Sequence, residues 1–388
     1  MSFKNIFFII FVLSFNTIYS QEQIIIGQKH VIHSNILNED RTYQIHLPQS
    51  YNWALDRKYP VLFVLDGESN FLHTVGSVDF LSSKGEIPEL IIVGIVSTVR
   101  IRDFTQTDWP SHWVGGGAAE NFKRFLSREL IPKIEHDYRT NGFRILSGHS
   151  AAGQFVLYTL TSKPSLFNAY FAISPSLDWD NNLPQRSLEE SFAKRDSLKA
   201  FLYFAWSNDF GKPLEDDLKL AQTLATKSPR GFRSASKSFP NETHGSVTLL
   251  AQIDALRQLY FGYRYTDDLV VYGFKFAEKH FQEVSNIVGY TIPVPENVFN
   301  SFGYEELNKG NIKEAISIFK RNIKQNPYSA NAYDSMADAY EKAGMWREAI
   351  VSSEKAVELA QKYKNPNLSY FVEHAKSLRK HYNSKDIK

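Results

Sequence analysis

The chain of 388 residues contains no cysteine, which excludes disulfides, thiolate metal sites, a cysteine nucleophile and a lipid-anchored cysteine. It also lacks any block of like charge, and its 44 basic and 42 acidic side chains give a formal net charge of only +2. This balance leaves no electrostatic footprint for nucleic acid or for an anionic membrane surface. We therefore expect no nucleic-acid partner, and any covalent catalysis must use a nucleophile other than cysteine.

Long apolar runs are absent after the amino-terminal segment. Lys4 and the apolar stretch over residues 6–15 are typical of a signal peptide at residues 1–20, with cleavage after Ser20. This stretch is shorter than the roughly 20 residues that a membrane-spanning helix needs. We expect export through a Sec-type signal and a mature protein that is periplasmic or secreted and outside the membrane. Retention of the segment as an anchor is the alternative.

The composition is that of an ordinary globular protein, with 43% apolar and 22% charged residues, and the length suits two domains. Between residues 24 and 265, apolar runs alternate with helical patterns, which predicts an α/β fold with a mostly parallel sheet. Five runs are apolar on both faces, as buried parallel strands are. They are residues 60–65, 90–96, 144–147, 169–173 and 200–205. Helical spacing predicts helices over residues 118–138 and 154–160.

The strongest chemical signal is the turn SGHSAAG at residues 147–153, between a predicted strand and a predicted helix. It is a variant of the G-x-S-x-G nucleophile elbow, in which the serine occupies a strained strand-to-helix turn. Such a turn demands small residues on both sides, and Gly148 and Ala152 meet this demand. Ser150 is therefore the predicted nucleophile, and the alternative is a small-residue turn with an idle serine.

A serine hydroxyl needs a base, which follows the nucleophile and the acid along the chain in this kind of site. His244 lies in a polar loop bounded by proline and glycine, where catalytic groups are commonly held, and is the predicted base. His280 lies in a helical run and is the weaker candidate. His149, next to the nucleophile, is expected to have a structural role or to contact substrate.

The orienting acid is expected shortly after the strand at residues 200–205. Asp209 is the preferred candidate, and Glu215, further along, is the alternative. A carboxylate here would fix the tautomer of His244 and stabilise its imidazolium. Capping of the helix over residues 217–225 is the structural alternative for Asp209.

Negative charge on the substrate carbonyl oxygen requires prearranged donors. The backbone N–H of Ala151 is the first predicted donor. The second is expected from the loop after residues 60–65, where Gly67 would allow a tight turn and either Gly67 or Glu68 would donate.

Six motifs in order carry a wider resemblance. They are residues 43–48 (YQIHLP), 65–71 (LDGESNF), 94–105, 148–153 (GHSAAG), 173–177 (ISPSL) and 242–247 (ETHGSV). Together they resemble the putative-esterase family, which includes enterochelin-esterase-like, esterase-D-like and feruloyl-esterase-like enzymes. The resemblance implies an α/β-hydrolase fold and hydrolysis of a carboxylic ester through an acyl-enzyme, with Ser150, Asp209 and His244 in the catalytic roles. It implies no metal and no organic cofactor, and a small-molecule ester substrate such as a siderophore or an acylated glycan.

Arg100, Arg102 and Asp103 follow the predicted strand at residues 90–96. They lie at the carboxyl edge of the sheet, where ligands bind in open α/β folds. They are candidates for binding an anionic or hydroxylated substrate, and a structural Arg–Asp pair is an equal alternative.

The sequence changes character after the esterase-like domain at residues 24–265. A helical run over residues 269–288 and a proline-rich connector fall in a predicted linker, residues 266–297. In residues 298–388, Gly310 and Ala315 recur as Gly344 and Ala349, a period of 34 that is typical of tetratricopeptide repeats. Two units and a terminal helix over residues 369–382 are too few to stand alone. We expect them to pack on the hydrolase domain or on a partner, with a structural or self-associating role preferred over a peptide-binding groove.

Two other functions stay open. One is an acyltransferase of the same fold that excludes water, and the other is a catalytically silent fold whose repeats bind a protein. The retained order of Ser150, Asp209 and His244 argues against silence. Product analysis distinguishes hydrolysis from acyl transfer.

Overall fold

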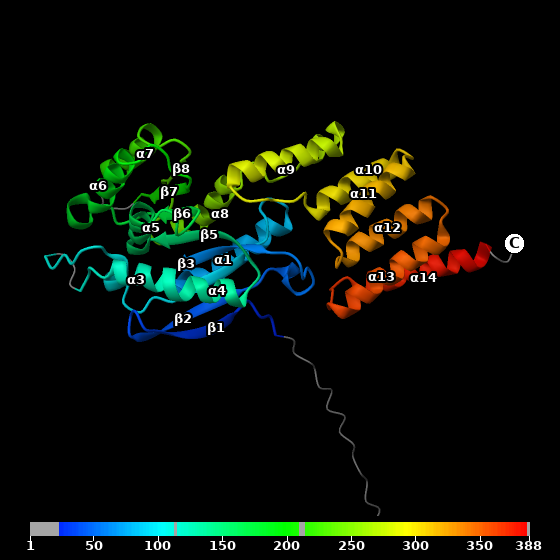
Figure 1. Cartoon of the computed structure of the whole chain (residues 1–388), viewed down its shortest axis with the longest axis horizontal. Helices are drawn as coiled ribbons and strands as arrows, with labels where there is room; N and C mark the ends of the chain where they lie inside the picture. Colours follow the sequence, from blue (N-terminus) through cyan, green and yellow to red (C-terminus); the bar gives the residue numbers. More distant parts are fainter. Residues whose placement is uncertain (1–22, 112–114, 209–213, 386–388) are drawn as a thin grey trace, which may run out of the picture.

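The computed structural model describes residues 23–111, 115–208 and 214–385, and an eight-stranded sheet lies at the centre of its first part (Figure 1). The sheet order is β1-β2-β4-β3-β5-β6-β7-β8. The pairs β1/β2 and β2/β4 are antiparallel, and all the other neighbouring strands are parallel. The strands are β1 (Gln28–Ser34), β2 (Glu39–His46), β3 (Tyr59–Leu65), β4 (Ile91–Ile95), β5 (Thr140–His149), β6 (Ala169–Ile173), β7 (Phe201–Ser207) and β8 (Arg233–Phe239). The predicted mostly parallel α/β fold is confirmed.

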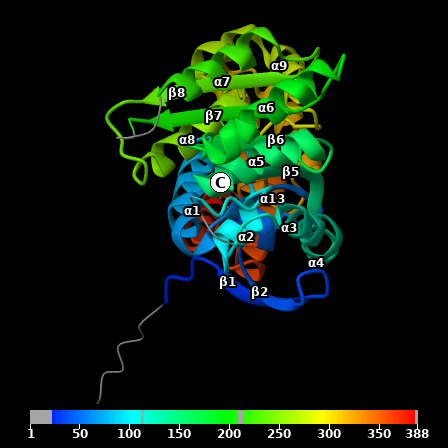
Figure 2. The same cartoon turned by 90° about the vertical axis from the view of Figure 1, so that its left-hand side faces the viewer.

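The five apolar runs predicted as buried strands are β3 to β7, the interior of the sheet. Every residue of β3, β4, β6 and β7 is buried, because helices cover both faces. The outer strands β1, β2 and β8 are not buried throughout, since each contains exposed and partly buried residues, and they therefore carry a weaker sequence signal. In Figure 2 the strands run from β8 and β7 near the top to β1 and β2 at the bottom.

Two apolar cores lie on opposite faces of the sheet, because successive side chains of a strand point to opposite sides. Val61, Phe63 and Leu65 of β3 pack with α3 to α7, whereas Leu62 and Val64 pack with α1 and α8. These helices, with the short α2 between them, are α1 (Gly67–Ser83), α2 (Arg100–Phe104), α3 (Ala119–Phe125), α4 (Ile131–Asp137), α5 (Ala151–Ser162), α6 (Trp179–Ala193), α7 (Leu214–Thr226) and α8 (Val247–Leu259).

The helix predicted over residues 118–138 is divided. A π-helical turn, Leu126–Leu130, separates α3 from α4, and the N–H of Ile131 donates to the carbonyl of Leu126. Pro132 follows directly and has no N–H, so the regular α-helical bonding pattern is interrupted at this point. The helical run predicted over residues 269–288 is divided as well. A 3-10 helix, Asp267–Tyr272, precedes α9 (Phe274–Val288), and Gly273 between them has φ 84°.

The carboxyl-terminal part is entirely helical over its described residues. Its helices are α10 (Glu296–Asn308), α11 (Ile312–Gln325), α12 (Ala330–Lys342), α13 (Trp346–Lys362) and α14 (Leu368–Lys385). Gly310 and Gly344 follow the first helix of each pair with φ 80° and φ 72°, which explains why glycine recurs at this spacing. The helical region therefore fits the predicted TPR-like pattern.

The helical tail packs on the sheet domain. Val298, Phe299 and Phe302 of α10 belong to the same apolar core as α1, α8 and one face of the sheet. A hydrogen bond from Arg57 Nη2 to Asn326 Oδ1, 2.8 Å long, also joins the two parts. The first tail helix is therefore part of the hydrolase core.

The predicted signal peptide, residues 1–20, lies outside the described residues. Among the helices that the structure does describe, none has both the length and the apolar character needed to cross a bilayer. Export stays a prediction.

Candidate active site

Ser150 stands at a sharp turn between β5 and α5. Its backbone has φ 61° and ψ −121°, a region that non-glycine residues enter only at a cost of roughly 1–3 kcal/mol. Backbone hydrogen bonds hold it there: its own N–H donates to the carbonyl of Ile173 at 3.0 Å, and its carbonyl accepts from the N–H groups of Gln154 at 3.0 Å and Ser176 at 3.2 Å. A serine kept in a strained turn at the carboxyl end of a central strand is the geometry of a nucleophile elbow.

Small residues allow this turn, as the sequence predicted. A Cβ added to Gly148 would lie 2.5 Å from the carbonyl oxygen of Ala152, so strand and helix approach too closely for any side chain there. Gly153 also leaves room for close packing, because a Cβ there would lie only 3.1 Å from the carbonyl oxygen of Ile173. Alanine at position 152 is fully buried, and the Cβ added at Gly148 would lie only 3.0 Å from its own Cβ, so position 152 also has to be small.

Two helices begin side by side at the carboxyl edge of the sheet. α5 begins at Ala151 after β5, and α1 begins at Gly67 after β3, the strand that pairs with β5. The first N–H groups of a helix have no carbonyl partner inside it. Within the described backbone, no hydrogen bond uses the N–H of Ala151, Gly67 or Glu68. These predicted donors therefore lie at the starts of two helices that follow neighbouring strands, where the helix dipoles also favour negative charge.

The loop after β3 differs from the prediction in one respect. The residue with positive φ is Asp66, at 53°, and not Gly67. Gly67 is required for a different reason, since a Cβ there would lie 2.7 Å from the backbone carbon of Gly94 in β4. Glycine allows α1 to begin directly against the neighbouring strand.

His244 lies half-buried in the loop between β8 and α8. Its ring centroid is 4.4 Å from that of His149, the residue before the nucleophile. This placement puts His244 beside the residue that precedes Ser150, and the pairing of His244 with Ser150 itself stays a prediction. His149 also forms a hydrogen bond with the backbone of His244, so it contacts both parts of the candidate pair.

Burial, together with the nearby ring of His244, lowers the pKa of His149 to about 4. His149 is therefore neutral near pH 7. This matters for catalysis, because a second positive charge beside His244 would oppose formation of its imidazolium. The structure thus places an uncharged imidazole beside His244.

A buried hydrogen bond fixes the helix that follows His244. Ser147 Oγ of β5 donates to Gln252 Oε1 of α8 at 2.6 Å. Val247, at the start of α8, is fully buried, and its N–H donates to the carbonyl of Thr243. The loop that carries His244 is therefore held by the Val247–Thr243 hydrogen bond across it and by the helix that follows it.

The two candidate acids are placed differently. Asp209 lies outside the described residues, so its role stays a prediction. Glu215 lies in the first turn of α7 with an exposed side chain. The alternative base His280 lies on α9, where its Nε2 is 2.7 Å from the carbonyl oxygen of Gly262 and its ring contacts Tyr265.

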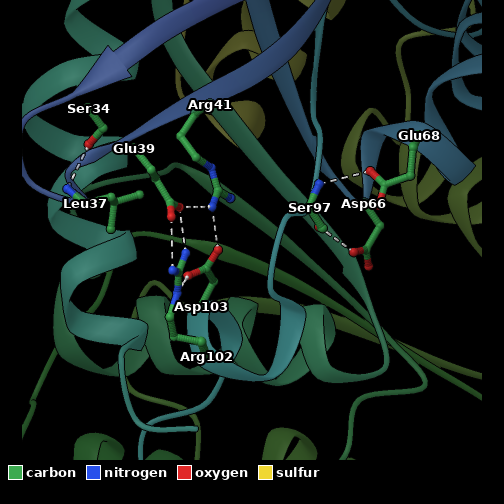
Figure 3. Close-up of polar contacts among 9 residues, drawn as sticks. All are labelled: Ser34, Leu37, Glu39, Arg41, Asp66, Glu68, Ser97, Arg102 and Asp103. Atoms are coloured by element: carbon green, nitrogen blue, oxygen red, sulfur yellow. Dashed lines mark hydrogen bonds and ion pairs between the residues drawn. The ribbon is translucent and has the colours of Figure 1, made fainter. Parts of the chain in front are cut away.

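Asp66 organises the edge of the site next to the elbow and was not among the predicted site residues. Its carboxylate accepts two hydrogen bonds from Arg100, at 2.7 and 2.9 Å, and one from the hydroxyl of Ser97 at 2.6 Å. Figure 3 shows Ser97 joined to both Asp66 and Glu68, and the backbone N–H of Ser97 donates to the Glu68 carboxylate at 3.0 Å. Hydrogen bonding to Asp66 raises the pKa of Arg100. Arg100 also reaches the carbonyl of His149 at 3.5 Å, and 41% of its side chain stays exposed.

Arg102 and Asp103 belong to a separate network (Figure 3). Asp103 is 1% exposed and accepts hydrogen bonds from Arg41 and Arg102, both at 2.7 Å. Arg102 also pairs with Glu39, and hydrogen bonds to both carboxylates raise its pKa. The structure thus shows the Arg–Asp pair that the sequence left as the alternative to substrate binding, and only Arg100 of the three contacts the elbow.

Known proteins resemble this chain in sequence and in fold. The model of the putative-esterase family matches residues 34–240, more than half of the chain. The chain belongs to this esterase family. The predicted family and fold are therefore confirmed, and this esterase is an enzyme that hydrolyses ester bonds.

Individual relatives agree with the family. Ferri-bacillibactin esterase BesA of Bacillus subtilis is 31% identical over 251 residues, which are 57% of this esterase and 85% of BesA. The crystal structure of an IroE-like serine hydrolase from Shewanella oneidensis is 29% identical with a TM-score of 0.66, covering 73% of this chain and 95% of that one. An uncharacterised protein from Capnocytophaga ochracea shares the fold over 91% of this chain and 99% of its own, with a TM-score of 0.60 at 18% identity. That coverage includes the helical tail.

Proposed function

We propose that the esterase hydrolyses its substrate through an acyl-enzyme on Ser150, with His244 as the general base. The observation that carries this proposal is the strained turn at Ser150 together with the contact between His244 and the adjacent His149, whose ring centroids lie 4.4 Å apart. A nucleophile and a histidine from distant parts of the sequence are thereby brought to one edge of the sheet.

The proposed reaction has two steps. Ser150 Oγ attacks the ester carbonyl carbon while His244 takes the hydroxyl proton, and the N–H groups of Ala151 and of Gly67 or Glu68 bind the oxyanion. The carbon–oxygen bond then breaks, and His244 gives the proton to the leaving alcohol. In the second step water attacks the acyl carbon, His244 takes its proton, and Ser150 leaves with that proton as the free hydroxyl. Asp209 is the proposed orienting acid and Glu215 the alternative.

We propose an ester of the siderophore class as the substrate. This rests on the relatives, since BesA is named as a ferri-bacillibactin esterase and shares 31% identity over most of its length. An acylated glycan is the second candidate. Comparison of kcat/KM on a catecholate siderophore lactone and on feruloylated or acetylated oligosaccharides decides between them, and we expect the lactone to be the better substrate.

The catalytic assignment is tested with p-nitrophenyl acetate and butyrate. We expect Ser150→Ala and His244→Ala each to lower kcat by at least about 1,000-fold, as loss of a nucleophile or base does. His280→Ala is the matched control and should retain activity within a few-fold. Equal activity of all four proteins would overturn the assignment, and acyl transfer to added alcohols in preference to water would indicate an acyltransferase.

We also propose that the esterase is exported with removal of residues 1–20. Lys4 and the apolar stretch at residues 6–15 support this. Amino-terminal sequencing of protein from a secretion-competent host should begin at Gln21. A protein retained in the cytoplasm with Met1 intact would contradict export.

A further inference from the structure

A group of titratable side chains in the helical tail lies outside the esterase site. His374 of α14 contacts two carboxylates of α12, those of Asp334 and Asp338. The Glu341 carboxylate joins them, one turn after Asp338 on the same helix face, and potential ligand atoms of His374, Asp338 and Glu341 all lie within 4.8 Å of one another. All three side chains are half-buried, so small ions can reach them.

The orientation of the imidazole is fixed by its Nδ1 atom. This atom is 2.7 Å from Asp334 Oδ1, and the Asp334 side chain is only 4% exposed. A hydrogen bond of this length requires the proton on Nδ1, because a carboxylate can only accept. Metal-binding histidines commonly have this arrangement, in which a carboxylate accepts one N–H and the other nitrogen faces the ion.

The second nitrogen faces another carboxylate. His374 Nε2 is 3.3 Å from Asp338 Oδ1, while Asp338 Oδ2 accepts a hydrogen bond from the Tyr304 hydroxyl at 2.7 Å. In a neutral imidazole with its proton on Nδ1, the lone pair of Nε2 would point at the Asp338 oxygen and repel it. Either a second proton or a cation must therefore lie between the two atoms.

Distance and charge favour a cation. Ligand atoms bound about 2.0–2.1 Å from a tetrahedral zinc ion are separated by roughly 3.3–3.4 Å, close to the observed Nε2–Oδ1 distance. Three carboxylates surround one imidazole, and among the described residues no lysine or arginine forms an ion pair with any of them. The described residues also give the Glu341 carboxylate no hydrogen bond or ion pair, so its oxygens remain available as ligands.

We propose that His374, Asp338 and Glu341 bind one divalent transition-metal ion of the zinc type, with Asp334 and Tyr304 orienting the ligands. One imidazole and two carboxylates suit zinc, cobalt or manganese and leave a position for water. The ion fastens α14 to α12 at the end of the tail, whereas the sequence led us to expect no metal. It takes no part in the proposed reaction at Ser150, so the two proposals stand or fall separately.

The test is a titration of chelator-treated, untagged full-length mature protein with zinc chloride, followed by calorimetry. We expect one equivalent bound by the wild type and an affinity at least about 10-fold weaker in His374→Gln and in Glu341→Gln. Zinc should also raise the thermal midpoint of the wild type by mass action, but not that of the two variants. His381→Gln is the matched control on the same helix and should bind as the wild type does. Glu341→Gln removes no hydrogen bond or ion pair among the described residues and keeps the side-chain shape, so it separates ligand loss from misfolding.

Three outcomes would overturn the proposal. They are no stoichiometric binding by the wild type, equal binding by wild type and both variants, or a loss of binding in His381→Gln as large as in His374→Gln. The first outcome would show that a second proton holds the Asp–His–Asp contact. Esterase activity is measured in parallel and should not change on chelation.

Discussion

At the scale of single residues, burial gives His149 a pKa well below that of an ordinary histidine. The ring centroids of His149 and His244 lie 4.4 Å apart, with the rings tilted by 48°, and burial lowers the pKa of His149 to about 4. The neutral ring places no second positive charge beside His244, which suits the role of general base that we propose for His244. The sequence showed both histidines near the site, but their contact depends on the packing of α8 against β5.

The low pKa of His149 predicts how stability depends on pH. Unfolded His149 binds a proton near pH 6.5, whereas the folded residue does so only near pH 4. Between these values the unfolded state holds more protons, so the free energy of unfolding falls as the pH falls, by on the order of 3 kcal/mol for this residue. Urea unfolding at pH 7 and pH 4.5 should show a smaller loss for His149→Asn than for the wild type.

The exposed His33 provides the control for that comparison. His33→Asn should follow the pH dependence of the wild type. The same loss of stability in all three proteins would show that His149 titrates normally in the folded state.

Asp103 tests whether the buried charge network binds substrate or supports the fold. Asp103→Asn leaves Arg41, which is 1% exposed, without its full counter-charge, and breaking such a pair costs roughly 3–5 kcal/mol. We expect a correspondingly lower urea midpoint and an unchanged KM for p-nitrophenyl butyrate. A raised KM with normal stability would instead place Asp103 in the substrate site.

At the scale of elements, the sequence was most informative where both faces of a strand are buried. Runs such as residues 169–173 coincide with β6 because only apolar residues fit there. The outer strand β1, the π-helical turn before Ile131 and the positive φ of Asp66 left no comparable pattern. The elbow was predictable because its strain requires small neighbours, whereas the Asp66–Arg100 pair depends on how two loops meet.

Gly148 gives the sharpest prediction about the elbow. Gly148→Ala places a Cβ 2.5 Å from the carbonyl oxygen of Ala152, so α5 must move away from β5. We expect about 1–3 kcal/mol of destabilisation and at least a 10-fold lower kcat, because Ser150 moves with the helix. Calorimetric unfolding and p-nitrophenyl butyrate kinetics measure the two effects.

Gly76→Ala is the matched control. It lies on α1, and nothing stands within 4 Å of the added Cβ. Alanine there should stabilise the helix by roughly 0.5–1 kcal/mol with no loss of activity. If both alanine variants behaved alike, close packing at the elbow would not explain glycine at position 148.

At the scale of the whole molecule, the tail and the hydrolase share one apolar core. Phe299 of α10 packs against Phe274, with ring centroids 4.9 Å apart, in the core that also covers the sheet. Leu378 of α14 lies in a separate cluster within the tail. The sequence predicted that so short a repeat must pack on something, but not that α10 would complete the hydrolase core.

This difference predicts unequal effects of two core truncations. Phe299→Ala should cost roughly 3–5 kcal/mol and lower the temperature at which esterase activity is lost on heating. Leu378→Ala removes comparable burial, but its effect should stay within the tail and leave that temperature nearly unchanged. Equal shifts in the inactivation temperature would mean that the tail unfolds as one unit with the hydrolase.

The central claim is that Ser150 is the nucleophile activated by His244, and covalent labelling tests it most directly. A fluorophosphonate probe should modify one residue, found by peptide mass spectrometry to be Ser150, and His244→Ala should slow labelling at least about 100-fold while His280→Ala should not. Labelling at another residue, or none in a preparation that still hydrolyses p-nitrophenyl butyrate, would contradict the account.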